Sequence, residues 1–430
     1  MLQQGGPFLC LATMPFEVVL RGQAEQRLTI FYWQTGTSLS RMSAGARGPI
    51  HVLTLTPFYP SQNDDASGCF VSEPLAWLAK VGVRNTVFTV QPLYRRRLRA
   101  SDSAVPADWL RHFALPGGFG LPIAGAFVLA RIVGRVRTLH RIHRIDLIHA
   151  HASLPCGHAA MLLSKELGIP YVVSVHGLDA FSTAQVTGRV GAWCHRISRR
   201  VYASSRRVIC VSESVREQVL EGMGRSCRTS VVYNGVDPEL FSPGDQPASE
   251  SIVILSVGSL LSIDGHELLV RGASSLAFEF PALRWEFIGH GRERSCLQNL
   301  AQQLRVDTRV RFLGRQPRQQ IATAMRRCTV FALPSRQEGL ANVYLEAMST
   351  SKPVIGCRGQ GIAEIIQHGS NGFLVGPDNE KELTLAIAML LRDESYRRNL
   401  GTAARDTILD RLTLAHQAES LARIYRESIA

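Results

Sequence analysis

Two acidic side chains, Glu338 and Glu346, have the type and spacing of a pair that binds one ligand. Glu338 follows a short apolar run (330–333) and the pair Pro334-Ser335, a pattern typical of a buried strand that ends in a loop. Glu346 lies within a segment of helical composition (341–349). Carboxylates placed in this way accept hydrogen bonds from sugar hydroxyls and from a vicinal diol, while the free N–H groups at the start of the helix attract an anion. Solvated helix positions are the alternative for both residues.

The same stretch repeats a strand, a loop and a helix. A second apolar run (353–356) leads into a loop with two glycines and a short helix predicted over 362–367. This alternation predicts a parallel sheet with crossover helices, in which ligands bind at the carboxyl ends of the strands. Earlier in the chain it predicts strands over 50–56, 86–90, 146–151, 171–175, 207–212, 252–257, 285–288 and 310–313.

A set of motifs in a fixed order connects the chain to a known family. Pro334-Ser335-x-x-Glu338-Gly339, followed by Leu345-Glu346-Ala347-Met348 with seven residues between Glu338 and Glu346, resembles the signature of the family 4 glycosyltransferases. The run His176-Gly177-Leu178-Asp179 and the turn Asn234-Gly235-Val236-Asp237 also resemble that family. The resemblance extends from near Ile50 to the C-terminus. It implies the α/β GT-B fold, in which two doubly wound, Rossmann-like parallel-sheet domains face each other across a cleft. It also implies transfer of a sugar from a nucleoside diphosphate sugar with retention of anomeric configuration.

The resemblance also implies roles for single residues. Glu338 would contact the sugar hydroxyls and His176 would face the transferred sugar from the other domain, so these two are the expected catalytic residues. Glu346 would anchor the ribose. No metal or other cofactor is expected, because no carboxylate pair of the Asp-x-Asp type lies in a suitable loop. The other expected donor-binding residues are Gly68, Gly258, Ser259, Gly289, Arg315, Gly339, Leu340, Ala341 and Asn342.

The chain departs from the family pattern where the family commonly has two cations that bind the donor diphosphate. Ser259 and Asp264 occupy those positions here. A charge-assisted hydrogen bond to phosphate contributes roughly 1.5–3 kcal/mol, so replacing Lys by Asp weakens donor binding unless another cation compensates. The candidates, all predicted on loops near strand ends, are Arg292, Arg315 and Arg336.

Length and composition predict two globular domains. The chain of 430 residues is too long for one typical core, and 45% hydrophobic with 19% charged residues is a globular composition. We expect an N-terminal acceptor-binding domain over 48–240 and a C-terminal domain over 241–414 that binds the nucleotide sugar, joined by a polar linker at 242–251. A last helix at 415–430 is expected to pack back on the first domain. Residues 1–47 lie outside the family pattern, and we expect a poorly ordered extension or a start-site artefact there.

The net charge of +13 is concentrated in the first part of the chain, where residues 1–240 carry 26 Lys and Arg against 15 Asp and Glu. A basic face attracts an anionic membrane or a phosphorylated acceptor. Nine cysteines without a CxxC pair favour free thiols in a reducing cytoplasm. The apolar stretch 117–133 contains Pro122 and Arg131, which favours a packed helix over a membrane span. We therefore expect a cytoplasmic protein with peripheral contact at the inner face of the cytoplasmic membrane.

The sequence thus predicts a hexosyltransferase that uses a UDP-sugar or GDP-mannose and acts on a glycan or lipid-linked acceptor in polysaccharide or glycolipid biosynthesis of the cell envelope. Three alternatives remain. One is another GT-B enzyme, such as a nucleotide-sugar epimerase or a phosphorylase. The second is a catalytically silent glycan-binding relative, which Ser259 and Asp264 favour. The third, a nucleic-acid binder, lacks an aromatic platform interleaved with the basic runs.

Overall fold

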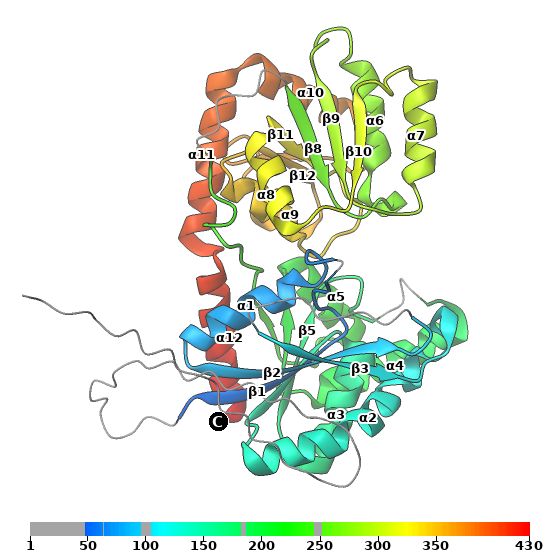
Figure 1. The fold of residues 1–430 in the computed structure, drawn as a ribbon, viewed down its shortest axis with the longest axis vertical. Coiled ribbons are helices and arrows are strands. Elements are labelled where there is room, and N and C mark those ends of the chain that lie inside the picture. The colour runs from blue at the N-terminus through cyan, green and yellow to red at the C-terminus, as the bar shows by residue number, and fades with distance from the viewer. Residues whose placement is uncertain (1–47, 63, 96–104, 182–185, 245–251) are drawn as a thin grey trace, which may run out of the picture. The chain divides into compact units, whose positions relative to one another are not determined.

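The computed structural model describes residues 48–62, 64–95, 105–181, 186–244 and 252–430. The extension expected at 1–47 and most of the linker expected at 242–251 lie outside these residues. The described chain forms two parallel β-sheets flanked by helices (Figure 1). The predicted class of fold, two α/β domains each with a doubly wound parallel sheet, is therefore confirmed.

The first sheet has the strand order β3-β2-β1-β4-β5-β6-β7, with every neighbouring pair parallel. Strand β5 is buried at all five positions, as expected for a parallel strand covered by helices on both faces. The strands are β1 (Ile50–Thr56), β2 (Val83–Pro92), β3 (Ala107–His112), β4 (Leu147–His151), β5 (Tyr171–Val175), β6 (Arg207–Cys210) and β7 (Thr229–Val231). The helices are α1 (Cys69–Lys80), α2 (Leu121–Ile142), α3 (His158–Leu167), α4 (Gly188–Ser204) and α5 (Glu213–Met223).

The second sheet has the order β10-β9-β8-β11-β12-β13, again entirely parallel. Its core packs Trp285 and Phe287 of β9 against helices on the sheet. The strands are β8 (Val253–Val257), β9 (Arg284–Ile288), β10 (Val310–Gly314), β11 (Val330–Ala332), β12 (Val354–Cys357) and β13 (Phe373–Val375). The helices are α6 (His266–Ser275), α7 (Arg294–Gln303), α8 (Arg318–Arg327), α9 (Asn342–Ser349), α10 (Glu380–Arg392), α11 (Glu394–Arg411) and α12 (Leu414–Ile429).

Helix α12 returns to the first domain. Leu421 and Tyr425 of α12 share a buried cluster with Val52, Leu147 and Val172 of the first sheet. The helix lies beside α1 on that sheet (Figure 1). Its start is fixed by Thr413, whose hydroxyl accepts a hydrogen bond from the His416 N–H, a side-chain cap that satisfies one of the free N–H groups of the first turn.

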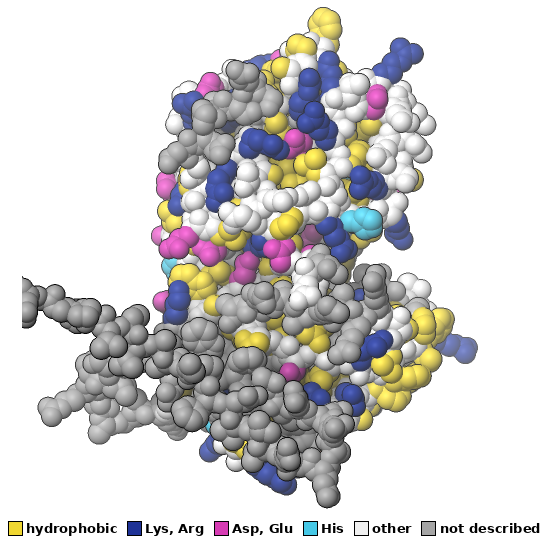
Figure 2. Space-filling model, viewed as in Figure 1, with side chains coloured by type: hydrophobic (Ala, Val, Ile, Leu, Met, Phe, Trp, Pro, Cys, Tyr) yellow, Lys and Arg dark blue, Asp and Glu magenta, His cyan; other side chains and the backbone are white. Residues whose placement is uncertain are grey.

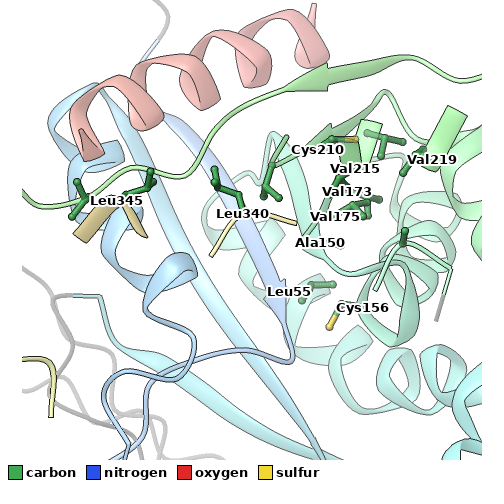
Figure 3. Close-up of a cluster of buried hydrophobic side chains, with 14 of the residues drawn as sticks. Leu55, Ala150, Cys156, Val173, Val175, Cys210, Val215, Val219, Leu340 and Leu345 are labelled. Carbon is green, nitrogen blue, oxygen red and sulfur yellow. The ribbon is translucent and has the colours of Figure 1, made fainter. Parts of the chain in front are cut away.

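The two domains share part of one buried apolar cluster. Leu340 and Leu345, which lie before and within α9, belong to the same cluster as Val173, Val175 and Cys210 of the first sheet (Figure 3). The chain segment that holds the predicted ligand-binding residues therefore packs against the first domain.

The strand orders locate where a ligand can bind. In each sheet the direction of strand addition reverses once, between β1 and β4 and between β8 and β11. Ligands of doubly wound sheets bind outside the carboxyl ends of the strands at such reversals. The loops that follow β1, β8 and β11 carry Gly68, Ser259 and Glu338, so most of the predicted site belongs to loops at these two points.

Several local predictions need correction. The helix expected over 362–367 is a short 3-10 turn, Gly361–Glu364, and the N–H of Gln367 donates to Oδ1 of Asn371 at 2.7 Å instead of continuing a helix. Strand β3 and helix α4 were not predicted, although the buried residues of α4 recur at helical spacing: Gly191, Cys194, Ile197, Ser198, Val201 and Tyr202. The eight described cysteines are all free thiols. Within the described residues, no helix is both long and apolar enough to cross a membrane.

Candidate active site

Two loops from different domains meet through glycines. A Cβ atom on Gly339 would lie 2.1 Å from the carbonyl oxygen of His176, and one on Gly177 would lie 3.1 Å from the Cα of Gly339. A Cβ on Gly361 would lie 1.6 Å from the carbonyl oxygen of Gly339. A side chain at Gly339 or Gly361 would overlap backbone atoms, and Gly177 has a φ of 131°, which residues with a side chain rarely adopt. The structure thus brings together the predicted catalytic residues' loops, 176–177 and 338–339, at one junction.

The loop that carries Glu338 is held by one glutamine. The N–H of Glu338 donates to Oε1 of Gln360 at 2.7 Å, and Nε2 of Gln360 donates to the carbonyl of Arg336 at 2.8 Å. Burial raises the pKa of Glu338 to about 7, and the negative charge of Asp264 adds to this effect. Glu338 is therefore poised between its neutral and ionised forms near neutral pH, as a group with a chemical role often is.

Asp264, the residue in place of the family's lysine, has a structural role. Its side chain is 4% exposed, and Oδ2 accepts a hydrogen bond from the N–H of Leu261 at 3.2 Å, which closes a 3-10 turn (Ser262–Asp264). Burial raises the pKa of Asp264 to about 6. The following residue, Gly265, has φ 69°, and a Cβ there would lie 2.2 Å from the carbonyl oxygen of Pro334. Asp264 is thus fixed close to the end of β11, where its charge acts on Glu338.

Glu346 is 1% exposed inside α9. Its Oε1 accepts a hydrogen bond from Nη1 of Arg318 at 2.5 Å, whereas its Oε2 is buried without a partner among the described residues. One carboxylate oxygen of Glu346 therefore lacks a hydrogen-bond donor among the described residues. Reasoning from the sequence missed Arg318, although an arginine directly after Pro317, at a helix start that follows a strand, is a pattern that could have pointed to it.

The start of α9 contacts the first domain. Nδ2 of Asn234 donates to Oδ1 of Asn342 at 2.8 Å and to the carbonyl of Leu340 at 3.4 Å. Ala341 precedes the helix and provides no side-chain cap, so the first N–H groups of α9 have no side chain bound to them from that position. Among the predicted residues, Leu340, Ala341 and Asn342 therefore lie at this contact between the domains.

His176 lies at the carboxyl end of β5 in an aromatic environment. Its ring centroid is 4.7 Å from that of Phe70 and 5.9 Å from that of Phe58, and its Nε2 is hydrogen bonded to Nδ1 of His151 at 3.1 Å. Burial lowers the pKa of His176, so the ring is neutral at neutral pH. Its Nδ1 is buried without a partner among the described residues. His151, to which the sequence assigned no role, is thus the residue that orients His176.

The predicted glycines differ in what they contribute. Gly68 has φ 79°, and a Cβ there would lie 2.5 Å from the backbone nitrogen of Tyr59, so only glycine suits this position before α1. A Cβ on Gly289 would lie 1.7 Å from the carbonyl oxygen of Gly258, so the loops after β8 and β9 touch. Ser259 is exposed beside them.

The three arginines predicted to replace the missing cations are all paired with carboxylates. Arg315 pairs with Asp64 at 2.9 Å, and Arg292 approaches Glu293 at 3.8 Å. Arg336 pairs with both Glu267 and Asp378 at 2.5 Å. Arg315 therefore joins the loop after β10 to the loop after β1, and its predicted contact with the donor stays a prediction. No three His, Cys, Asp or Glu side chains of the described chain are grouped to hold a metal ion, and the expectation of a metal-free reaction also stays a prediction.

Comparisons with known proteins agree with this geometry. The family model for glycosyl transferases group 1 matches residues 240–407, and the model for glycosyltransferase family 4 matches residues 71–240. An uncharacterized glycosyltransferase of Methanocaldococcus jannaschii is 31% identical over 264 residues, which are 61% of this chain and 70% of the relative. The chain therefore belongs to the family 4 glycosyltransferases of the GT-B class. It is a transferase enzyme.

Other relatives and solved structures extend the likeness over most of the chain. A D-inositol 3-phosphate glycosyltransferase of Corynebacterium urealyticum is 27% identical over 406 residues, covering 86% of this chain and 93% of the relative. Sucrose-phosphate synthase of Thermosynechococcus elongatus has a TM-score of 0.71 at 19% identity, covering 88% of this chain and 98% of that one. Anabaena HepE in complex with UDP has a TM-score of 0.69 at 20% identity, covering 88% and 100%. At these identities the solved structures support the fold alone.

Proposed function

We propose that the protein transfers a hexose from a nucleoside diphosphate sugar to a hydroxyl group of its acceptor with retention of configuration. The observation that carries the proposal is the contact between the loop of Glu338 and Gly339 and the loop of His176 and Gly177. In the reaction the acceptor oxygen forms a bond to the anomeric carbon while the bond from that carbon to the phosphate oxygen breaks, and the proton of the acceptor hydroxyl passes to the departing diphosphate. Ionised Glu338 supports the positive charge that develops at the anomeric carbon.

The donor would be held by groups of the second domain. The unpartnered Oε2 of Glu346 accepts hydrogen bonds from the ribose diol. The N–H groups around Gly339 to Asn342, before and at the start of α9, bind the diphosphate, since a helix start favours negative charge. Neutral His176 binds the sugar from the first domain. A uridine nucleotide is the first donor to test, because the HepE structures contain UDP and UDP-glucose.

The acceptor would be an anionic or lipid-linked molecule bound by the first domain. Residues 1–240 carry an excess of eleven positive charges, which attracts phosphate and carboxylate groups. Two relatives are named for anionic acceptors: D-inositol 3-phosphate glycosyltransferase and, in Bacillus anthracis, N-acetyl-alpha-D-glucosaminyl L-malate synthase, which is 27% identical over 276 residues. The names of these relatives support an acceptor that carries negative charge. If the acceptor is lipid-linked, the protein acts in polysaccharide or glycolipid biosynthesis.

One face of the first domain suits contact with an anionic bilayer. We define the apolar–basic face by the exposed side chains Phe113, Phe119, Phe127, Trp193, Arg131, Arg189 and Arg196. The rings of Phe113 and Phe127 are 5.1 Å apart, and α2 packs against α4. Residues 109–145 and 180–212 each contain six arginines and no Asp or Glu. Hydrophobic and basic side chains lie side by side in the lower right of Figure 2, where Figure 1 places β3 and α4. Aromatic rings flanked by arginines are the chemistry that binds an anionic membrane surface.

Donor turnover tests the proposal directly. The purified protein is incubated with a panel of UDP- and GDP-sugars, and release of the nucleotide is measured with and without acceptors. We expect turnover of at least one donor, complete loss in Glu338→Ala, and full activity in the control Gln337→Ala, a change at the exposed neighbouring position. Undiminished turnover in Glu338→Ala would remove the assignment of Glu338.

A silent, glycan-binding relative is the second candidate. Asp264 and Ser259 favour it, because neither supplies the positive charge that a diphosphate needs. Calorimetry with UDP, GDP and their sugars separates the two candidates. A transferase gives heat of binding with at least one nucleotide, whereas a silent relative gives none with any nucleotide and retains binding to glycans.

A further inference from the structure

Arg318, the first residue of α8, is the centre of a buried ionic cluster that joins the two domains. Its side chain is 10% exposed. Nε and Nη2 donate to Oε1 of Glu73 in α1 at 3.0 and 2.7 Å, and Nη1 donates to Oε1 of Glu346 in α9 at 2.5 Å. The guanidinium also lies 4.8 Å from the centre of the Phe241 ring. Every branch of the side chain is therefore fixed.

The backbone around Arg318 is held as well. The N–H of Arg318 donates to both carboxylate oxygens of Asp65 at 3.2 Å. The adjacent residue of that loop, Asp64, pairs with Arg315 at 2.9 Å. Two consecutive carboxylates after β1 thus bind the segment between β10 and α8. The same loop continues to Gly68, so this ionic cluster fixes the loop that contains the predicted donor-binding glycine.

Around the guanidinium of Arg318 the cluster contains one positive and two negative side chains, those of Arg318, Glu73 and Glu346, and this leaves acceptor atoms without donors. Oε2 of Glu73 and Oε2 of Glu346 are both buried without a hydrogen-bond partner among the described residues. A buried carboxylate oxygen without a donor is costly, and a ligand hydroxyl that reaches it restores the missing hydrogen bond. The hydrogen bond from Arg318 occupies only Oε1 of Glu346. It holds the carboxylate in one orientation, and Oε2 keeps a fixed position without a donor.

We propose that Arg318 is a positioning residue for the donor nucleotide, which directs the free oxygen of Glu346 toward the ribose diol and, through Glu73, connects that site to helix α1 of the acceptor domain. This role rests on the proposed function, in which Glu346 receives the ribose. Arg318 helps nucleotide binding in this arrangement because the diol and the guanidinium use different oxygens of the same carboxylate. The hydrogen bonds from Arg318 to Glu73 hold α8 against α1, and so hold together the two domains between which the transfer takes place.

The test compares nucleotides with and without the diol. Binding of UDP and of 2′,3′-dideoxyuridine diphosphate, and of the corresponding guanosine pair, is measured by calorimetry. The ratio of the two dissociation constants reports the hydrogen bonds of the diol. In the wild-type protein we expect the dideoxy nucleotide to bind about tenfold more weakly or worse, as expected for lost hydrogen bonds to a charged group. General damage to the fold weakens both nucleotides and leaves the ratio unchanged.

Three variants separate the effect of the contact between Arg318 and Glu346 from the effect of its contact with Glu73. Arg318→Met is expected to bring the ratio to near one, because Glu346 loses the group that orients it. Arg318→Lys is expected to restore the ratio in part. Glu73→Gln is expected to retain the wild-type ratio and to lower kcat, because it weakens only the arm to α1. Arg311→Met, the same chemical change at an exposed position of β10, is the matched control.

The outcomes separate this inference from the proposed function. A wild-type ratio in Arg318→Met, or tighter nucleotide binding in that variant, overturns the role of Arg318 alone. If Arg318→Met does not fold, an unchanged ratio in Arg318→Lys has the same meaning. If the wild-type protein binds neither UDP nor GDP, the proposed function fails and this inference fails with it.

Discussion

The carboxylate of Asp264, which closes the turn after β8, acts on Glu338 in the loop after β11 and helps burial to raise the pKa of Glu338 to about 7. The residue that stands where a lysine is common in the family therefore changes the charge state of the predicted catalytic carboxylate. Asp264 is itself buried, which raises its own pKa to about 6. Removing one of these two negative charges favours ionisation of the other.

The first prediction concerns the pH dependence of activity. If ionised Glu338 is required, kcat/KM rises with pH and has a midpoint near 7, because kcat/KM reports the free enzyme. Asp264→Asn removes a negative charge, so the pKa of Glu338 falls and the midpoint moves to lower pH. Burial, the larger cause, remains, so the midpoint stays above the ordinary value of 4.5. Asp307→Asn, at an exposed position, is the control. If the midpoint of the pH dependence of kcat/KM is the same in Asp264→Asn as in the wild type, Asp264 does not raise the pKa of Glu338.

The second prediction concerns stability. The pKa of Glu338 is about 7 in the folded protein and has an ordinary value of 4.5, so the folded protein holds this proton more tightly than the unfolded chain does. Ionisation of Glu338 therefore destabilises the folded protein, and the free energy of unfolding decreases as the pH rises from about 4.5 to 7. Glu338→Gln removes that cost, and its melting temperature should exceed that of the wild type at pH 8 but not at pH 4.5. Glu221→Gln, an exposed control, should change neither value. An equal difference at both pH values would rule out ionisation as the cause.

The third prediction concerns the contact of the two loops. Gly339→Ala places a Cβ 2.1 Å from the carbonyl of His176, so the loops must separate. We expect loss of most transferase activity with little change in the circular dichroism of the folded protein. The control is Gly134→Ala, which meets no atom within 4 Å in the middle of α2 and should raise stability by up to about 1 kcal/mol. Normal turnover in Gly339→Ala would show that transfer does not need this approach of the loops.

The fourth prediction concerns the apolar–basic face. The protein should sediment with vesicles that contain phosphatidylglycerol, less so with phosphatidylcholine alone, and less so as the salt concentration rises. Replacing Phe119 and Trp193 together by Ser should reduce binding, because both side chains are exposed on this face. Phe278→Ser is the control, since Phe278 is fully exposed on the second domain. Equal loss in the control, or equal binding to neutral vesicles, would count against the face.

The sequence was sufficient for the fold and for the positions of the predicted site residues at strand ends. Glu338 and Gly339 follow a strand and its breaker, and His176 follows a buried strand, so their places at strand ends could be read from neighbouring residues. The partners of those residues could not. Arg318 meets Glu73 across 245 positions of the chain, and His151 meets His176 across 25. No local pattern records such pairings, because they depend on how the strands are ordered and on how the two sheets meet.

Strand β3 was missed for a different reason. Its sequence, ADWLRH, alternates weakly and places an arginine and an aspartate in the sheet, so its pairing with β2 rather than its composition makes it a strand. The arginines that were predicted to bind the donor diphosphate also differ from expectation. Arg292, Arg315 and Arg336 lie on loops as predicted, but each has a carboxylate partner that only the structure reveals.

Helix α12 has a consequence for how the chain matures. Tyr425 donates or accepts a hydrogen bond at 2.7 Å with His149 in the middle of the first sheet, and Leu421 covers Val52 and its neighbours. The half of the protein that is synthesised first is therefore completed by a helix that is synthesised after the whole second sheet. Until α12 has been synthesised, the apolar surface around Val52 stays uncovered, and a recombinant fragment that stops at the linker would expose the same surface.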